Sequence, residues 1–142
     1  RAADLAILVR DRVEAEAIRT ALSQLGLNSV YLCARDSVFA SPEAEDLRHW
    51  LAACAEPEEP ALIRRALATA TLDLSFAQLE ALNQDELQWE TIALRFRGYR
   101  AQWRSQGVLA MLHQFLHDFA LPQRCLAKPQ GERSLTNLLH LA

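Results

Sequence analysis

Glycine is scarce in this sequence, and none of its four glycines precedes a lysine: Gly26, Gly98, Gly107 and Gly131. The chain therefore lacks the G-x-x-x-x-G-K-[ST] loop, whose backbone amides and lysine hold nucleotide phosphates. No substitute phosphate loop is visible, and no cluster of carboxylates with a lysine indicates a nuclease metal site. We therefore expect the chain on its own to bind neither ATP nor a metal ion, and to catalyse nothing.

A basic surplus is also missing, because the formal net charge is −3. This argues against a freestanding nucleic-acid-binding protein, which needs cations to neutralise phosphates. The three cysteines, Cys33, Cys54 and Cys125, are odd in number and widely spaced. They suit reduced thiols in a cytoplasmic protein rather than a disulfide framework. No apolar run reaches the length of about 20 residues that a membrane-spanning helix needs.

Residues 5–32 have the pattern of a strand, a helix and a second strand. Residues 5–9 (LAILV) form an unbroken apolar run, which is typical of a strand buried on both faces of a parallel sheet. Asp11 and Glu14 form a capping-box pattern at the start of the helix, and Gly26 is suited to end it. We predict a parallel pair formed by residues 5–9 and 29–32, connected by a right-handed crossover. Two strands are too few for a complete sheet, so the other strands are expected elsewhere in a longer sequence.

The rest of the sequence shows helical periodicity, and a domain boundary is predicted at residues 56–60 (EPEEP), where two prolines interrupt that periodicity. Ser41 and Pro42 predict a helix start, and Ser75 is expected to cap a short helix that ends near Leu82. A longer helix is predicted over residues 84–105, with an apolar stripe made of Trp89, Ile92, Phe96, Tyr99 and Trp103. The predicted fold class is thus α/β but mostly α, with residues 1–56 forming one domain part and residues 57–142 an all-helical part.

Several segments resemble superfamily 1 DNA helicases of the UvrD/RecB type, at the start of their second motor domain. Residues 4–10 (DLAILVR), 30–39 (VYLCARDSVF) and 41–47 (SPEAEDL) carry this resemblance. The RecB branch is favoured by residues 66–70 (ALATA), 98–104 (GYRAQWR) and 131–140 (GERSLTNLLH). UvrD-like helicases usually have paired glycines and a double aromatic where this chain has Cys33-Ala34 and Val38-Phe39. A UvrD-type or AddA-type helicase is the alternative within the family, and the segment 131–140 argues against it.

The resemblance implies that residues 1–56 belong to a RecA-like motor domain and residues 57–142 to a helical subdomain inserted in it. It also implies a parent enzyme that unwinds and degrades double-stranded DNA ends in recombinational repair, with ATP and Mg²⁺ as cofactors. DNA and the other subunits of a RecBCD-type complex would be the partners. The sequence begins at Arg1 and stops at Ala142 inside a helical pattern, so we expect an excised piece of that enzyme.

The resemblance assigns a catalytic role to Arg10, because the corresponding arginine in relatives reaches the terminal phosphate of ATP. The alternative is a solvated arginine after a strand. Arg35 is a candidate for contact with a DNA phosphate. Phe39 is a candidate either for stacking on a base or for packing beneath its own loop.

Other patterns are less specific. The arginines at positions 64, 65, 95, 97, 100 and 104 form either a patch for DNA or another subunit, or a solvated helix face. His113 and His117 have the i, i+4 spacing of metal ligands, but no third ligand accompanies them, so no metal site is predicted. The competing class is an independent helical interaction module with a small, complete sheet. A helicase fragment should instead expose apolar surface, and it is expected to be a monomer or a weak dimer.

Overall fold

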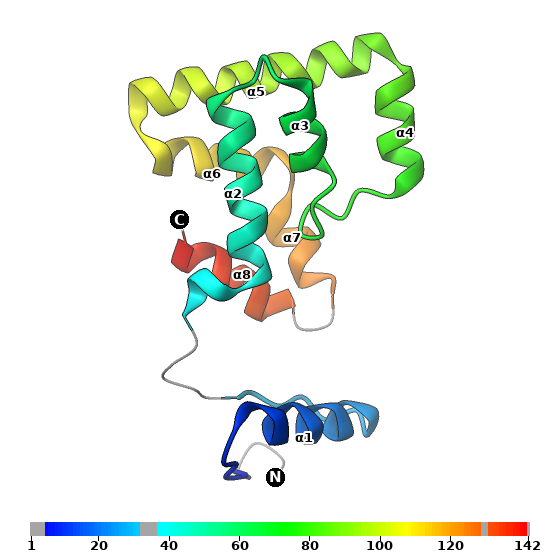
Figure 1. Ribbon diagram of the computed structural model, residues 1–142, viewed down its shortest axis with the longest axis vertical. Helices are drawn as coiled ribbons and strands as arrows, with labels where there is room; N and C mark the ends of the chain where they lie inside the picture. Colours follow the sequence, from blue (N-terminus) through cyan, green and yellow to red (C-terminus); the bar gives the residue numbers. More distant parts are fainter. Residues whose placement is uncertain (1–4, 32–36, 129–130, 142) are drawn as a thin grey trace. The chain divides into compact units, whose positions relative to one another are not determined.

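A computed structural model of the chain describes residues 5–31, 37–128 and 131–141. Contacts between residues divide the chain into two compact units, residues 1–36 (unit 1) and residues 37–142 (unit 2) (Figure 1). Every regular element among the described residues is a helix. The fold is therefore all-helical as far as the structure describes it.

Unit 1 lacks the expected parallel strands among its described residues. Residues 5–9 and 27–31 have irregular backbone on either side of helix α1 (Arg12–Gln24), and Leu32 lies outside the described residues. The predicted α/β class with a partial RecA-like sheet is thus wrong for the described chain. The physical reason is a lack of partners, since a parallel strand needs neighbours on both edges and cover on both faces. Leu5, Leu8 and Val30 are instead exposed.

The predicted caps of helix α1 are present, with one difference. The Asp11 carboxylate accepts a hydrogen bond from the backbone N–H of Glu14 at 2.9 Å. The Glu14 carboxylate bonds to the backbone N–H of Arg10, at 3.0 Å, and not to that of Asp11. The returning bond of the capping box is therefore displaced by one residue.

Helix α1 ends in a Schellman motif. Gly26 has φ of +72°, and its N–H donates to the carbonyl of Ser23 at 3.0 Å. The N–H of Leu27 donates to the carbonyl of Leu22 at 2.9 Å, which completes the motif. A glycine suits this position because a side chain at such a φ is strained. The apolar side chains of α1 are only partly covered, because Ile18 and Leu22 are half-buried but Leu25 is exposed.

Unit 2 holds the core of the molecule. Its elements are a short 3₁₀ helix, η2 (Val38–Ala40), and the helices α2 (Pro42–Ala55), α3 (Pro60–Leu67), α4 (Phe76–Gln84), α5 (Glu86–Gln106), α6 (Val108–Asp118), α7 (Leu121–Leu126) and α8 (Gly131–Leu141). Helix α2 contacts η2, α3, α5 and α8. The predicted boundary between residues 56 and 57 therefore separates helices that pack together in this unit. As an assignment to domains of a longer protein, it stays a prediction.

Polar side chains cap the start of three of these helices, and two of the three starts lie where the sequence predicts. Ser41 accepts a hydrogen bond from the N–H of Ala44 at 3.3 Å, and Pro42 follows in the first turn. Ser75 and Gln78 form a complete capping box at the start of α4. Asp85 then ends α4 and caps α5. The predicted break between these two helices is thus present, but it lies at Asp85, and α5 begins two residues after its predicted start.

Aromatic rings meet at the centre of unit 2. The ring of Phe115 lies 5.1 Å from that of Trp50, 4.7 Å from that of Phe119 and 5.3 Å from that of Tyr99, measured between centroids. Phe96 lies against the same ring at 6.0 Å. Such offset and edge contacts add stability beyond the burial of apolar area. The predicted stripe of α5 is confirmed, because Phe96 and Tyr99 are buried and the other three members pack against the core.

Candidate functional site

Arg10 lies immediately before the capped start of α1, with 90% of its side chain exposed. Its Nε and Nη2 both donate to Oε1 of Glu14, at 2.9 and 2.5 Å. Among the described residues, none other bonds to its guanidinium. The local pairing orients the arginine while leaving Nη1 available to a further group. An exposed ion pair of this kind contributes little to stability, so it does not by itself explain the arginine.

Of the other two predicted site residues, the structure describes only Phe39. Arg35 lies outside the described residues. Phe39 belongs to the 3₁₀ helix η2 in unit 2, where the Ser37 hydroxyl accepts a hydrogen bond from its backbone N–H at 3.3 Å. Its side chain is 79% exposed. The ring of Phe39 is thus available at the surface of unit 2, and its proposed role in stacking stays a prediction.

The arginines of α3 and α5 do not form one row of free cations. Arg97 makes an ion pair with Glu58 at 3.1 Å, which ties α5 to the turn before α3, and a second pair with Glu90 of α5 itself at 3.2 Å. The hydrogen bond from Arg97 lowers the pKa of Glu58. Arg95 lies 5.8 Å from the centroid of the Phe119 ring. Several members of the predicted patch therefore have structural partners within unit 2.

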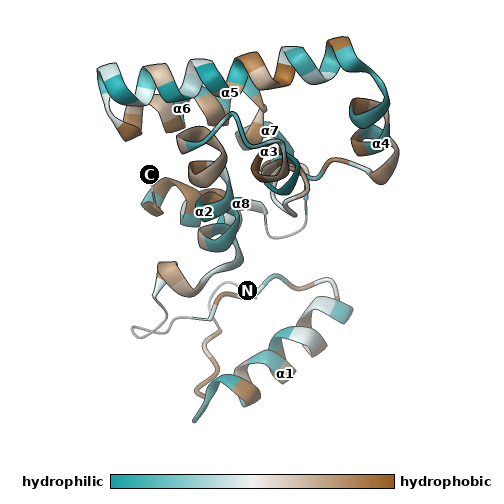
Figure 2. Ribbon diagram, turned by 45° about the horizontal axis from the view of Figure 1, so that its top comes forward, coloured by the Kyte–Doolittle hydropathy of each residue, from teal (hydrophilic) through white to brown (hydrophobic). Residues whose placement is uncertain are grey.

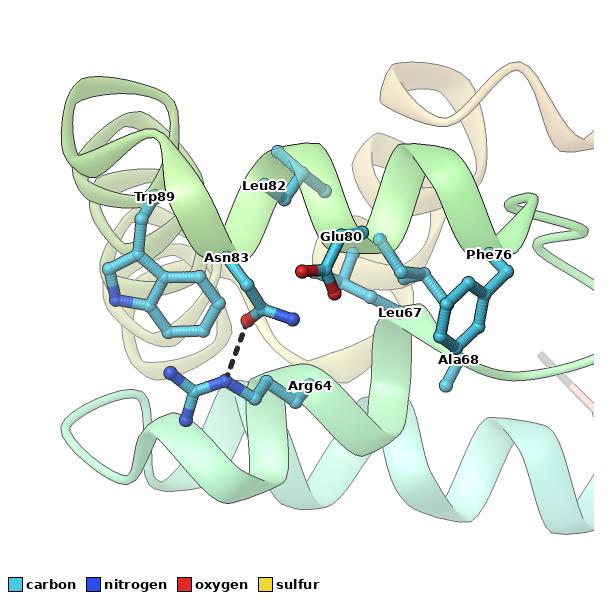
Figure 3. A pocket seen from close by; sticks show the side chains of 9 residues that line it. Arg64, Leu67, Ala68, Phe76, Glu80, Leu82, Asn83 and Trp89 are labelled. Atoms are coloured by element: carbon cyan, nitrogen blue, oxygen red, sulfur yellow. Dashed lines mark hydrogen bonds between the residues drawn. The ribbon is translucent and has the colours of Figure 1, made fainter.

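A small pocket of about 200 Å³ lies between α3, α4 and the first turn of α5 (Figure 3). The guanidinium carbon of Arg64 lies 4.6 Å from the centroid of the Trp89 ring, and its Nε donates to Asn83 at 2.9 Å. Glu80, on the pocket wall, accepts a hydrogen bond from Gln84 at 2.7 Å. These polar groups orient one another, and the nine lining residues include no nucleophile paired with a base. No pattern in the sequence predicted this pocket.

Potential metal ligands and thiols are dispersed in the described part of the chain. His113 and His117 are both exposed, and His117 lies 3.5 Å from the carboxylate of Asp118. No group of three or more His, Cys, Asp or Glu side chains is placed to hold a metal ion among the described residues. Cys54 and Cys125 are free and buried, and burial raises the pKa of the Cys54 thiol to about 12. A thiol with such a pKa is unreactive at neutral pH.

No helix in the described ranges has the length and apolarity that crossing a bilayer requires.

Comparison with known proteins finds similarity over the whole length of the chain. It is 42% identical over all 142 residues to the RecBCD enzyme subunit RecB of Escherichia coli K12, and equally identical to that of Haemophilus influenzae. It is 32% identical over 141 residues to the RecB subunit of Mycobacterium tuberculosis. The chain spans 12% of the length of each of these curated relatives. No protein-family model matches it.

These matches define the chain as homologous to a subunit of RecBCD enzymes. More narrowly, it belongs to the RecB family and corresponds to about one-eighth of a RecB subunit. The resemblance to the RecB branch is thereby confirmed. The matches also agree with the exposed apolar residues of unit 1, because a segment of a larger protein leaves uncovered the surface on which its other parts pack.

Proposed function

We propose that the chain acts as a segment of an ATP-dependent DNA helicase and exonuclease of the RecBCD type, which processes double-stranded DNA ends in recombinational repair. The observation that carries this proposal is the 42% identity to RecB subunits over the whole chain. The alternative, an independent helical interaction module, needs a small complete sheet, which the described residues lack. The end-to-end homology therefore favours a segment of a larger enzyme.

In this proposal the rest of the longer protein holds the ATP and Mg²⁺ sites and makes most of the contacts with DNA and with the partner subunits. The residues of this chain do not fit a nucleotide or metal site, because the sequence has no phosphate loop and the described part has no cluster of metal ligands. What the chain contributes is a scaffold, one catalytic cationic side chain and two candidate contacts with DNA. Residues 1–56 are proposed to belong to the second motor domain and residues 57–142 to a helical subdomain inserted in it.

The cationic side chain is Arg10, which we assign as an arginine finger. A guanidinium stays charged at any physiological pH, and its planar set of donors suits phosphate oxygens. Arg10 is exposed, is oriented by Glu14, and retains an unpaired Nη1 among the described residues. These features support a role in stabilising the charge that develops on a transferred phosphoryl group. Arg35 and Phe39 are proposed to contact single-stranded DNA, through a phosphate and a base respectively.

The arginine-finger proposal is tested in the full-length RecB-type protein with its partner subunits. Arg10→Ala is expected to lower ATP turnover by roughly 10³-fold, as for other arginine fingers, with a much smaller change in nucleotide affinity. Arg48→Ala is the matched control, because it removes an exposed, glutamate-paired arginine of unit 2 that has no proposed contact with ATP. Its turnover should stay close to that of the unchanged protein. Unchanged turnover in Arg10→Ala would overturn the finger role and leave the RecB homology intact.

A further inference from the structure

One face of α5 carries a continuous row of exposed residues with no charged member. The row, here called the α5 stripe, consists of Leu87, Thr91, Leu94, Gly98, Ala101 and Ser105. Its members alternate in steps of four and three, so they form a single line along the helix. Leu87 is 82% exposed and Leu94 is 56% exposed. In Figures 1 and 2, α5 forms an edge of unit 2, and hydrophobic residues recur along it between hydrophilic ones.

The polar members of the α5 stripe are already satisfied within the helix. The hydroxyl of Thr91 donates to the carbonyl of Leu87 at 2.8 Å, and the hydroxyl of Ser105 donates to that of Ala101 at 3.0 Å. The stripe therefore presents methyl and methylene groups without an unpaired side-chain donor. A methyl group added at Gly98 would have no neighbour within 4 Å, so a partner backbone has room to approach closely.

Charges beside the α5 stripe differ in sign between its two ends. Glu86 precedes the first stripe residue and Arg104 precedes the last, so both lie on the same side of the row. Within the described part of the chain, neither Glu86 nor Arg104 forms an ion pair. Glu90 and Arg97, which lie between these two residues along the helix, pair with each other. The two unpaired charges are about 27 Å apart along the helix axis, at 1.5 Å per residue. The ends of the stripe are thus electrostatically distinct.

We propose that the α5 stripe is the docking surface for an antiparallel α-helix that belongs to the same longer polypeptide but lies outside these 142 residues. Helix partners commonly pack an apolar face along such a row at steps of three and four. Helices favour acidic residues at their N-terminus and basic residues at their C-terminus. An antiparallel helix with this charge distribution places its acidic end beside Arg104 and its basic end beside Glu86. A parallel one would bring like charges together.

The length of the related RecB subunits indicates where the docking helix comes from. The chain covers only 12% of each RecB subunit that it matches, so most of such a polypeptide remains to supply the helix. The inference rests on the proposed placement of the chain within a RecB-type protein. It does not depend on Arg10, which lies in the other unit.

Photo-crosslinking in the full-length protein with its partner subunits tests the proposal. Ser105→benzoylphenylalanine places the probe on the stripe, and Gln106→benzoylphenylalanine is a matched control on the neighbouring exposed position off the stripe. Mass spectrometry of a mixture of isotope-labelled and unlabelled protein separates crosslinks within one polypeptide from crosslinks between two copies. We expect position 105, and not position 106, to crosslink within its own polypeptide to one segment outside residues 1–142.

A charge variant tests the antiparallel orientation. Arg104→Glu should reduce the yield of the crosslink about two- to five-fold, the effect of losing one exposed ion pair. Arg65→Glu, an exposed arginine away from the stripe, should not reduce it. A crosslink from position 105 to residues 1–36, to a second copy or to another subunit overturns the proposal, as does no crosslink above the control. ATP turnover measured on the same preparations separates these outcomes from a failure of the proposed function.

Discussion

The indole nitrogen of Trp50 donates a hydrogen bond to the hydroxyl of Thr69 at 2.9 Å inside unit 2. The Thr69 hydroxyl in turn donates to the carbonyl of Ala66 at 2.8 Å. Both side chains are buried, and they join α2 to the turn that follows α3. The largest side chain of the core thus has its one polar atom satisfied by a residue 19 positions later in the sequence.

Thr69→Val should destabilise the chain by about 1–3 kcal/mol, because it leaves the buried indole N–H without an acceptor. Urea unfolding followed by circular dichroism measures this change. Thr69→Ser keeps the hydroxyl and removes only one methyl group, so its cost should be smaller, at about 0.8 kcal/mol. Equal stability of the valine and serine variants would contradict the importance of this hydrogen bond.

Replacing two glycines by alanine, one at a time, should change the stability of the chain in opposite directions. A methyl group at Gly131 would lie 1.6 Å from the carbonyl oxygen of Cys125, whereas one at Gly98 meets nothing within 4 Å. Gly131→Ala should therefore cost about 1–3 kcal/mol, because the start of α8 must move away from a backbone atom. Gly98→Ala should stabilise α5 by about 0.5–1 kcal/mol through its higher helix propensity.

Thermal unfolding of the two alanine variants compares them directly. The midpoint should fall for Gly131→Ala and rise for Gly98→Ala, relative to the unchanged chain. A similar shift in both variants would show that helix propensity, and not the close approach to Cys125, decides the outcome.

Local sequence signals predicted the starts of α1, α2 and α4. Ser41, Ser75 and Asp11 cap helices because a short polar side chain reaches the free N–H groups of the next turn, and this needs no distant partner. The periodic stripe of α5 likewise identified Phe96 and Tyr99 as core. Such features depend on residues within a few positions of each other.

The predictions that failed depended on distant partners. The apolar run of residues 5–9 was interpreted as a strand, but a run of this kind forms a sheet only when neighbouring strands are present. The exposure of Leu87 and Leu94 was not predicted either, because a helical pattern does not show which apolar face is covered. For the candidate site, the sequence led to Arg10 through family resemblance. The pairing of Arg10 with Glu14 required the structure.

Glu43 should make the stability of unit 2 sensitive to acid. Its carboxylate is buried at the start of α2 and accepts a hydrogen bond from Asn137 of α8 at 3.0 Å. Burial raises the pKa of this carboxyl, but hydrogen bonds, including those from Ser134, Asn137 and Ser41, lower the pKa by more, so that it is lowered overall. The hydrogen bond from Ser134 has the largest effect of the three. The ionised form therefore stabilises the fold above the usual pKa of 4.5, and this contribution is lost as the pH falls through the lower, folded-state value.

Glu43→Gln should flatten the dependence of unfolding free energy on pH below about 4.5, where a glutamate in the unfolded chain becomes protonated. Urea unfolding at a series of pH values from neutral to acidic measures this slope. Glu45→Gln, in the same helical turn but exposed, is the matched control and should keep the slope of the unchanged chain. An identical slope in both variants would exclude Glu43 as the source of acid sensitivity.

Truncation should locate the folding boundary at residue 36 and not at residue 56. The central cluster of buried residues lies entirely within residues 37–142, and α2 contributes four of its members: Leu47, Trp50, Ala53 and Cys54. A fragment of residues 37–142 should therefore unfold cooperatively with nearly the midpoint of the full chain. A fragment of residues 57–142 lacks Trp50, whose ring stacks on that of Phe115. This fragment should therefore show no cooperative unfolding transition by circular dichroism. Cooperative unfolding of the shorter fragment would show instead that α3 to α8 form a complete core, and that the predicted boundary after residue 56 is also a folding boundary.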